Sequence, residues 1–530
     1  MNHSHISWEN KTTRLLSDSL LKTAHSSPEK IGFVIEGTNY TYKQLHSDAL
    51  YLTIGLQSRG VKRGDRVAIY MDNTWPCIVS IYATLMAGGV FIVINPQTKT
   101  EKLSYLLNNS DTEILLTDAH LHSSFSTAIQ KSPKIIHVIY SGHIKAEFEC
   151  TAHLSQFDSV LSESTAPMAP LKTIPNDLAA LVYTSGSTGP PKGVMLTHQA
   201  MVFATGSLIQ YLRLTLSDRL MLVLPFSFDY GLYQLLMSVH LGATLIVERS
   251  FTFPAQIYKR MLEEEATVFP GVPTIFAMIT ATHNRKSLCF PSVTRVTNTA
   301  AALPPSLIPD LKNIFPNALI YKMYGQTECK RISYLEPEFI DQKSASVGKA
   351  IPGTEVFILS PNGDKVQNGE SGILHVRGPH LMAGYWKNDK KSQKVLKPGL
   401  LPGEQILCTH DTFHMDKEGF LFFEGRSDDI IKTRGEKVSP LEVENALLAI
   451  SGIIEVAVVG TQDDILGEKI VAYIVVENDF LFNEKHLKKK CLTILENFMV
   501  PQTITCLPTM PKTQNGKIDK KKLATMAENR

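Results

Sequence analysis

The sequence lacks a strong charge of either sign, because 53 lysines and arginines nearly balance 51 aspartates and glutamates among 530 residues. Nucleic acid or an anionic membrane is therefore not indicated as the main partner. Cysteine is also scarce: the seven cysteines are an odd number, lie far apart and form no Cys-x-x-Cys pair. That spacing argues against a disulfide framework or a zinc ribbon, and it favours a reducing compartment.

Signals for secretion or membrane attachment are missing as well. The first ten residues hold no basic region followed by an apolar core, and the last four match no address or lipidation signal. The most apolar stretch, residues 77–94, contains two adjacent glycines, which predict a buried helix followed by a strand. We therefore expect a cytosolic protein without a transmembrane segment.

Short apolar, β-branched runs alternate with segments of helical length in the first two thirds of the chain. These runs predict buried strands at residues 66–70, 113–116, 135–140, 178–183, 220–224 and 244–247, with helices such as 75–87 and 256–265 between them. Alternation of this kind predicts layered α/β subdomains. After about residue 347 the strands are short and separated by turn residues, at 356–359, 372–376 and 420–423. This pattern of short strands and turns predicts a β-rich subdomain.

A domain boundary is predicted near residues 425–435. Beyond it, helices from about 440 and 484 and strands at 456–459 and 470–476 predict a small α+β domain. The expected fold class is thus α/β, with a large N-terminal domain of layered α/β subdomains plus a β-rich subdomain, and a small C-terminal domain. We expect two domains, 1–425 and 426–530.

The strongest local motif is TSGSTGPPKG at residues 184–193, directly after a predicted strand. Small residues let backbone N–H groups approach an anion, hydroxyls add donors, and Lys192 adds a positive charge. The motif is not a Walker A loop, because Pro191 precedes the lysine and Gly193 follows it. We interpret it as a phosphate-binding loop between a strand and a helix; the alternative is a flexible surface turn.

This motif resembles the signature loop of the adenylate-forming (AMP-binding) enzymes: acyl-CoA synthetases, adenylation domains of nonribosomal peptide synthetases, and luciferases. The resemblance continues in family order along most of the chain from about residue 30. It implies an AMP-binding N-terminal domain, a mobile C-terminal domain, and the use of ATP and Mg²⁺. The ATP-binding residues that it implies in the loop are Thr184, Ser185, Gly186, Ser187, Thr188, Gly189 and Lys192.

A second motif, YKMYGQTE, occupies residues 321–328. Its ring can stack on a base and its carboxylate can hold Mg²⁺ against phosphates, although a tight turn after a strand has a similar composition. The family resemblance implies Tyr324 against adenine, Thr327 on the phosphate and Glu328 near Mg²⁺, with Gly325 among the ATP-binding residues.

Two further segments resemble nucleotide-binding segments of the family but lack a usual glycine. NTAAAL at residues 298–303 resembles a segment that lines the adenine pocket and includes Ala301; Thr299 and Ala300 stand where two glycines are common. THD at residues 409–411 resembles Thr-Gly-Asp, with His410 in place of the glycine.

The resemblance implies that Asp411 accepts hydrogen bonds from both ribose hydroxyls, a role that suits a carboxylate. Arg426 matches the second ribose contact of the family. Asp428 falls where the small domain pivots, and Gly435 falls in the loop that admits the thiol. A charged interdomain linker is the plainer interpretation of this stretch, and it is compatible with a hinge.

A lysine-rich run, PKTQNGKIDKKKL, occupies residues 511–523. A solvated basic tail is the usual meaning of such a run. Its spacing also matches the last motif of the family, in which one lysine contacts the substrate carboxylate and the α-phosphate. Lys517 is that lysine, and we expect Lys517, Glu328 and Lys192 to be the catalytic residues.

The sequence has features of two classes of enzyme that differ in their acid substrate. By resemblance, residues 222–234 form one wall of the acyl pocket and include Phe228 and Asp229. Val272 belongs to the same pocket by the same resemblance. Phe228-Asp229 is similar to amino-acid-activating members, whose aspartate pairs with the α-ammonium, and a carboxylate in an apolar wall needs such a partner. The GQTE sequence at 325–328 and Val272-Pro-Thr are instead similar to CoA ligases.

We therefore expect an AMP-forming carboxylic acid ligase that adenylates an acyl substrate and transfers it to the thiol of CoA. The alternative is a stand-alone amino acid adenylation enzyme that loads the phosphopantetheine thiol of a separate carrier protein. A luciferase-like oxidase and a catalytically inactive nucleotide-binding protein are less favoured readings. A P-loop ATPase is disfavoured by the loop spacing. The expected partners are a small carboxylic or amino acid and CoA or a carrier protein.

Overall fold

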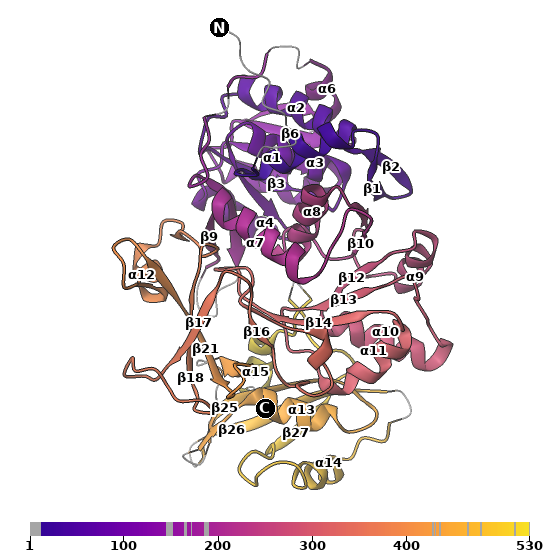
Figure 1. Ribbon diagram of the computed structural model, residues 1–530, viewed down its shortest axis with the longest axis vertical. Helices are drawn as coiled ribbons and strands as arrows, with labels where there is room; N and C mark the ends of the chain where they lie inside the picture. Colours follow the sequence, from indigo (N-terminus) through magenta and orange to yellow (C-terminus); the bar gives the residue numbers. More distant parts are fainter. Residues whose placement is uncertain are drawn as a thin grey trace. The chain divides into compact units, whose positions relative to one another are not determined.

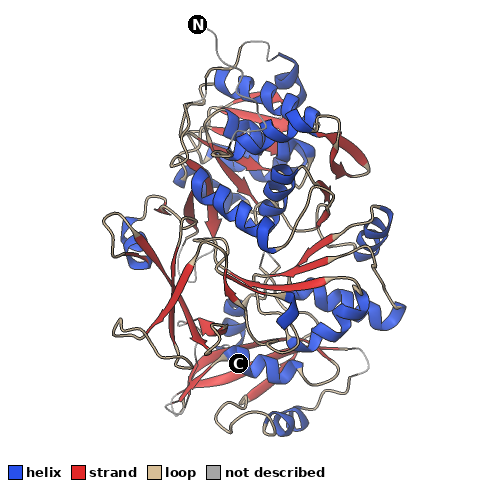
Figure 2. Ribbon diagram, viewed as in Figure 1, coloured by secondary structure: helices blue, strands red, loops and turns tan. Residues whose placement is uncertain are grey.

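The computed structural model has a mixed α/β fold (Figures 1 and 2). It describes residues 12–144, 152–163, 167–170, 172–184, 190–426, 429, 431–433, 436–463, 466–477, 480–513 and 516–528. The chain divides into two units, of which the first comprises Met1–Pro270, Gln326–Lys330 and Gly378–Leu396. The second comprises Gly271–Gly325, Arg331–Arg377 and Lys397–Arg530. The boundary expected at residue 425 stays a prediction.

The first unit contains an eight-stranded, mainly parallel sheet. In spatial order its strands are β19 (Gly384–Tyr385), β9 (Lys192–Thr197), β8 (Leu178–Thr184), β4 (Val90–Ile94), β3 (Arg66–Tyr70), β5 (Ile114–Asp118), β6 (His137–Ser141) and β7 (His153–Gln156). Its parallel strands read as continuous apolar runs because helices cover both faces of such sheets. Leu103 on one helix and Phe125 on the next pack on Ala68 and Leu115 of the sheet.

A second group of strands in the first unit is also largely parallel. Its order is β12 (Val268–Gly271), β10 (Arg219–Leu222), β11 (Thr244–Val247), β1 (Ile31–Ile35) and the antiparallel β2 (Thr38–Thr41). The helices of this unit are α1 (Leu16–Ser26), α2 (Tyr42–Ser58), α3 (Trp75–Met86), α4 (Thr100–Asn109), α5 (His122–Gln130), α6 (Phe157–Glu163), α7 (His198–Tyr211), α8 (Asp229–Leu241), α9 (Pro254–Glu263) and α12 (Asp389–Val395).

The chain around the glycine-rich motif differs from the prediction in one respect. The motif was expected to lead directly into a helix, but strand β9 follows it and pairs antiparallel with β8. Helix α7 begins only at His198, where the Thr197 hydroxyl accepts a hydrogen bond from the Ala200 N–H. From Val194 to Thr197 buried and partly exposed residues alternate, as expected of a strand with one covered face.

The second unit contains three groups of strands. One has the order β13 (Arg295–Asn298), β14 (Leu319–Tyr324), β15 (Ser333–Leu335) and β16 (Lys349–Ala350). The predicted β-rich part is present as β17 (Glu355–Leu359), β18 (Gly372–Arg377), β21 (Gln405–Met415) and β20 (Leu396–Pro398), with β22 (Leu421–Arg426) paired to β21. The C-terminal strands are β24 (Glu436–Val438), β23 (Ile431–Thr433), β26 (Gly467–Val476) and β25 (Ile453–Asp463), with β27 (Thr503–Cys506) paired to β26. The helices are α10 (Pro273–Lys286), α11 (Ile308–Ile314), α13 (Pro440–Leu448), α14 (Glu484–Cys491) and α15 (Lys520–Glu528).

The C-terminal sheet is apolar on both faces. Val456 and Val458 of β25 join one core cluster with residues of α13 and α14, whereas Ala457 and Val459 join another with residues of α15. Successive side chains of a strand point to opposite faces, so this run of four apolar residues supplies two cores. The predicted small α+β arrangement is confirmed.

The most apolar stretch also folds as predicted. Residues 77–94 form most of α3 and then β4, with a turn at Gly88-Gly89 between them. Among the described residues, no helix combines the length and the apolar character that crossing a membrane would require.

Candidate active site

Three side chains meet in the first unit at the end of the glycine-rich motif. Lys192 and Glu328 were predicted to belong to the site, and Tyr385 was not. Thr184 and Lys192 pair across β8 and β9, so they close the loop between them. The Lys192 Nζ lies 4.9 Å from the centre of the Tyr385 ring. The Tyr385 hydroxyl donates to Glu328 Oε1 at 2.7 Å, and the Met382 N–H donates to the Glu328 carbonyl at 2.8 Å. Tyr385 thus contacts the Lys192 ammonium through its ring and the Glu328 carboxylate through its hydroxyl.

Gly193 lies in a closely packed position between two aromatic residues. A Cβ there would lie 3.1 Å from the Tyr183 ring and 3.3 Å from the Trp386 side chain. The Gly193 carbonyl accepts the Trp386 N–H at 2.8 Å, which continues the pairing of β9 with β19. The glycine after Lys192 therefore lets β19 approach and brings Tyr385 beside the lysine.

Tyr385 was not predicted from the sequence. It lies 57 residues from Glu328 along the chain, and no spacing rule relates two residues at that separation. The segment Gln326–Lys330 clusters with the first unit although its neighbours on both sides belong to the second. Only the tertiary fold brings these residues together.

A buried ion pair lies two residues further along the same segment. Lys330 Nζ donates to the Asp229 carbonyl at 2.8 Å and lies 3.4 Å from Asp229 Oδ2. The same Nζ is 4.2 Å from the centre of the Tyr233 ring. Only 3% of the Lys330 side chain and 8% of the Asp229 side chain are exposed. Asp229, whose sequence context left open whether it binds a substrate amine, is thus paired within the chain.

The second unit gathers the residues predicted to bind adenosine. Asp411 and Arg426 stand opposite each other on β21 and β22, with Arg426 Nε 3.4 Å from Asp411 Oδ1. The Tyr324 hydroxyl donates to Asp411 Oδ2 at 2.5 Å. The Tyr324 ring packs edge-on against Phe413 and stacks with Phe423, at centroid distances of 4.8 and 6.0 Å. An aromatic surface, a carboxylate and a guanidinium therefore adjoin one another.

Both glycine-lacking segments adopt a backbone conformation that favours glycine. The φ angle is +77° at Ala300 and +57° at His410. His410 lies where β21 shifts register against β18, because Cys408 pairs with His375 but Thr412 pairs with Ile373. A bulge of this kind often uses a left-handed residue, and histidine tolerates that region better than most side chains. Ala300 and His410 thus both adopt a conformation that glycine adopts more readily.

Lys517 lies in a tight turn near the end of the second unit. Lys512 and Ile518 form an isolated antiparallel bridge, and the Thr513 N–H donates to the Lys517 carbonyl at 2.7 Å. The lysine side chain is exposed. The neighbouring Gly516 carbonyl accepts a hydrogen bond of 3.4 Å from the Thr274 hydroxyl.

The other predicted site residues are distributed over both units. Phe228, in the first unit, and Val272, in the second, are buried. Gly325 and Thr327 are half-buried, and Ala301 is exposed. Several predicted residues lie outside the described residues and stay predictions: Ser185, Gly186, Ser187, Thr188, Gly189, Asp428 and Gly435.

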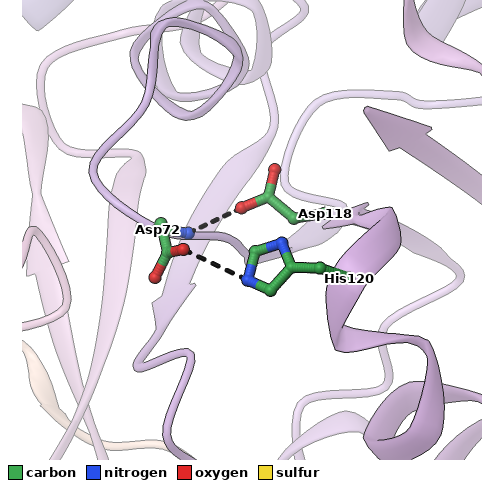
Figure 3. A group of neighbouring side chains, drawn as sticks. All are labelled: Asp72, Asp118 and His120. Carbon is green, nitrogen blue, oxygen red and sulfur yellow. Dashed lines mark hydrogen bonds and ion pairs between the residues drawn. The ribbon is translucent and has the colours of Figure 1, made fainter. Parts of the chain in front are cut away.

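A separate polar group lies at the carboxyl ends of β3 and β5 (Figure 3). The Asp72 N–H donates to Asp118 Oδ2 at 2.8 Å, and His120 Nε2 lies 3.2 Å from Asp72 Oδ2. Arg249 contacts Asp72 at 3.6 Å and Glu36 at 2.6 Å. A guanidinium this close disfavours a divalent cation, so the group is best described as an ion-pair network.

Burial raises the pKa of Asp118 to about 6. Folding therefore favours the protonated carboxyl group of Asp118. The contribution of this group to the free energy of unfolding is complete below pH 3.8 and is lost as the pH rises through 6. We predict that Asp118→Asn raises the free energy of unfolding at pH 8 by about 3 kcal/mol, and by less than half of that at pH 4.5. Thermal unfolding of both proteins across this pH range measures the effect. A gain that does not change with pH would contradict the assignment.

Known proteins resemble the chain along its whole length. The sequence model of the AMP-binding enzymes matches residues 20–386, and that of the AMP-binding enzyme C-terminal domain matches residues 442–517. A long-chain-fatty-acid–CoA ligase from Bacillus subtilis (strain 168) is 28% identical over 541 residues, covering 97% of this chain and 94% of that protein. Gramicidin S synthase 2 from Brevibacillus brevis is 28% identical over 518 residues, covering 97% of this chain and 11% of that protein.

A solved structure has the same fold. The crystal structure of an anthranilate–CoA ligase in complex with anthranoyl-AMP superposes on this chain with a TM-score of 0.89 at 22% identity, and 99% of each chain is covered. The predicted fold class, with a large N-terminal and a small C-terminal part, is confirmed.

Proposed function

Since the chain belongs to the AMP-binding enzyme family, we propose that it is an AMP-forming acid–thiol ligase. The carboxylate of an acid attacks the α-phosphate of ATP, which gives an acyl adenylate and releases pyrophosphate. The thiol of CoA then attacks the acyl carbon, the acyl–phosphate bond breaks, and AMP leaves. The first step makes the second feasible, because AMP is a far better leaving group than an oxide ion.

The group of Lys192, Tyr385 and Glu328 carries this proposal. A reaction between a carboxylate and a triphosphate gathers negative charge at one point. Lys192 and Lys517 would supply the opposing positive charge, and one such preorganised contact is worth about 10²–10³ in rate. A protein that only binds a nucleotide has no need of Lys517.

Glu328 suits Mg²⁺, because this cation prefers carboxylate oxygens and keeps several waters together with substrate phosphates. The bound cation would neutralise phosphate charge. Tyr385 holds the Glu328 carboxylate in one orientation by its 2.7 Å hydrogen bond. The tyrosine is therefore a positioning residue for the glutamate.

Tyr324, Asp411 and Arg426 would bind the adenosine of ATP. The Tyr324 ring offers a face to the base, and the Asp411 carboxylate accepts hydrogen bonds from the ribose hydroxyls. The Tyr324 hydroxyl and the Arg426 guanidinium orient that carboxylate from two sides.

We propose CoA as the acceptor, because a CoA ligase of nearly the same length as this chain is among its relatives. Asp428 would act as the hinge and Gly435 as the point of closest approach to the thiol. We place the reaction in the cytosol, since Cys77, Cys329 and the other described cysteines form no disulfide.

Acid-dependent exchange of labelled pyrophosphate into ATP tests the first step. A panel of fatty, aryl and amino acids is assayed, and the acids that support exchange are then incubated with CoA or with a phosphopantetheinylated carrier protein. We expect exchange with at least one acid and a CoA thioester by mass spectrometry. Exchange without a CoA thioester, but with loading of the carrier protein, would overturn the choice of acceptor.

Tyr385→Phe is predicted to lower kcat/KM for ATP about tenfold or more. The variant removes a hydrogen bond to a charged group, which contributes about 1.5–3 kcal/mol, but keeps the ring beside Lys192. Initial rates of AMP formation at varied ATP and Mg²⁺ measure the loss.

Tyr334→Phe is the matched control, because the Tyr334 hydroxyl also donates to a glutamate, Glu336, at 2.5 Å. This variant should keep the kcat/KM of the wild type. Equal losses in the two variants would show that Tyr385 has no special relation to Glu328.

A further inference from the structure

We infer that the ammonium of Lys330 takes the place opposite Asp229 that a substrate ammonium would need, so that the acid activated by this chain carries no amine next to its carboxylate. The inference rests on the proposed acid–thiol ligase activity and names the class of its substrate. Lys330 is then the residue that determines specificity for acids without an amine.

The contacts of the pair account for both charges. Lys330 Nζ donates to the Asp229 carbonyl at 2.8 Å, lies 3.4 Å from Oδ2 and faces the Tyr233 ring at 4.2 Å. An ammonium has three donors, and these contacts are two oxygen acceptors and an aromatic face. Because both side chains are almost fully buried, their charges interact with each other more than with water.

The backbone holds both residues in place. The φ angle of Lys330 is +63°, a left-handed conformation that a non-glycine residue keeps only where its surroundings impose it. On the other side, a Cβ at Gly231 would lie 2.4 Å from the Pro225 carbonyl oxygen. That glycine lets the first turn of α8 pack against the preceding loop, which fixes Asp229 at the start of the helix.

The pair lies where a ligand is expected in this kind of fold. Asp229 begins the helix that follows β10, at the carboxyl end of a strand that runs parallel to β11. Ligands of open parallel sheets bind outside the carboxyl ends of the strands. Lys330 is also two residues from Glu328, which is hydrogen-bonded to Tyr385 beside Lys192. Lys330 thus belongs to the same short segment, Gln326–Lys330, as the glutamate proposed to hold Mg²⁺.

An internal pair of this kind selects against amines. A substrate ammonium next to it would lose water without gaining an unpaired carboxylate, and it would meet the like charge of Lys330. An acid without an amine has no ammonium group to dehydrate, and the ion pair that it meets has no net charge. We expect the wild type to prefer an amine-free acid over the same acid with an α-amine by about 10²-fold or more.

The experiment compares acids that differ only by the α-amine: hexanoate with 2-aminohexanoate, and 3-phenylpropanoate with phenylalanine. Acid-dependent exchange of pyrophosphate into ATP gives kcat/KM for each. The wild type should support exchange with the amine-free member of a pair. A wild type that prefers the amino acid would overturn the inference without any variant.

Lys330→Met tests the residue itself. Without the lysine, the Asp229 carboxylate needs a new counter-charge, so the preference for the amine-free acid should narrow at least tenfold or reverse. Adding Asp229→Asn to Lys330→Met should abolish the gain with the amino acid. Lys322→Met removes another buried ammonium, whose acceptor is the Ser344 carbonyl, and should keep the wild-type preference. An unchanged preference in folded Lys330→Met would overturn the inference.

Binding separates this inference from the proposed activity. Non-hydrolysable acyl sulfamate analogues of the acyl adenylates, with and without the α-amine, are titrated into the wild type by calorimetry. Tighter binding of the amine-free analogue, with no thioester formed from any acid, would overturn the proposed function and leave the inference standing. Tighter binding of the amine-bearing analogue, or binding of neither, would overturn the inference.

Discussion

Lys517→Ala should lower the rate of acyl adenylate formation about 10²–10³-fold while leaving thiol transfer from a preformed acyl adenylate nearly unchanged. In the first half-reaction a carboxylate and a triphosphate must approach each other, so a positive charge between them stabilises the transition state. In the second half-reaction the triphosphate is gone and this demand falls. Exchange of pyrophosphate into ATP measures the first rate, and CoA thioester formation from synthetic acyl adenylate measures the second.

The control for this prediction is Lys522→Ala. Lys522 is an exposed lysine five residues further along, and its loss changes the net charge by the same amount. It should leave both half-reactions at the wild-type rate. Equal losses of the two half-reactions in Lys517→Ala would contradict the assigned role, because they would indicate a general effect on the fold.

Gly348→Ala should destabilise the protein by at least about 4 kcal/mol or prevent folding. The φ angle of Gly348 is +82°, and a Cβ there would lie 1.7 Å from the Tyr334 carbonyl oxygen and 2.3 Å from the Leu335 nitrogen. Both are backbone atoms, which cannot move aside as the end of a flexible side chain can. The same glycine bridges to Leu421, so the strain would reach β22.

Gly363→Ala separates this clash from backbone strain alone. The φ angle of Gly363 is +90°, and a Cβ there would meet nothing within 4 Å. The cost should be about 1 kcal/mol, because only the left-handed conformation is unfavourable for alanine. The thermal unfolding midpoint should fall by a few degrees in Gly363→Ala and by several times as much in Gly348→Ala. Similar shifts in the two variants would show that the contact at Gly348 relaxes.

The fold was predictable from the sequence wherever periodicity is local. The runs at 66–70 and 244–247 are strands β3 and β11 with the predicted bounds, and the helix predicted from residue 440 is α13. Strand β9 was missed because the six residues 192–197 follow the proline pair of the glycine-rich motif and carry no signal stronger than that motif. Its strand conformation comes from pairing with β8.

The candidate site was predictable only in part. Asp411 and Arg426 were identified separately by resemblance, and the structure pairs them across β21 and β22. Tyr385 and Lys330 act through partners 57 and 101 residues away, so no spacing pattern could reveal them. The amine-binding role considered for Asp229 was a sound reading of Phe228-Asp229, but the counter-charge of that carboxylate lies elsewhere in the chain.

The nucleotide and thioester products of one acid-dependent reaction test whether the protein is an AMP-forming acid–CoA ligase. The protein is incubated with ATP, Mg²⁺, CoA and an acid that supports pyrophosphate exchange, and all products are quantified by chromatography and mass spectrometry. We predict AMP, pyrophosphate and CoA thioester in equal amounts, with no AMP when the acid is omitted. ADP and phosphate in place of AMP and pyrophosphate would contradict it, as would AMP formation that does not depend on the acid.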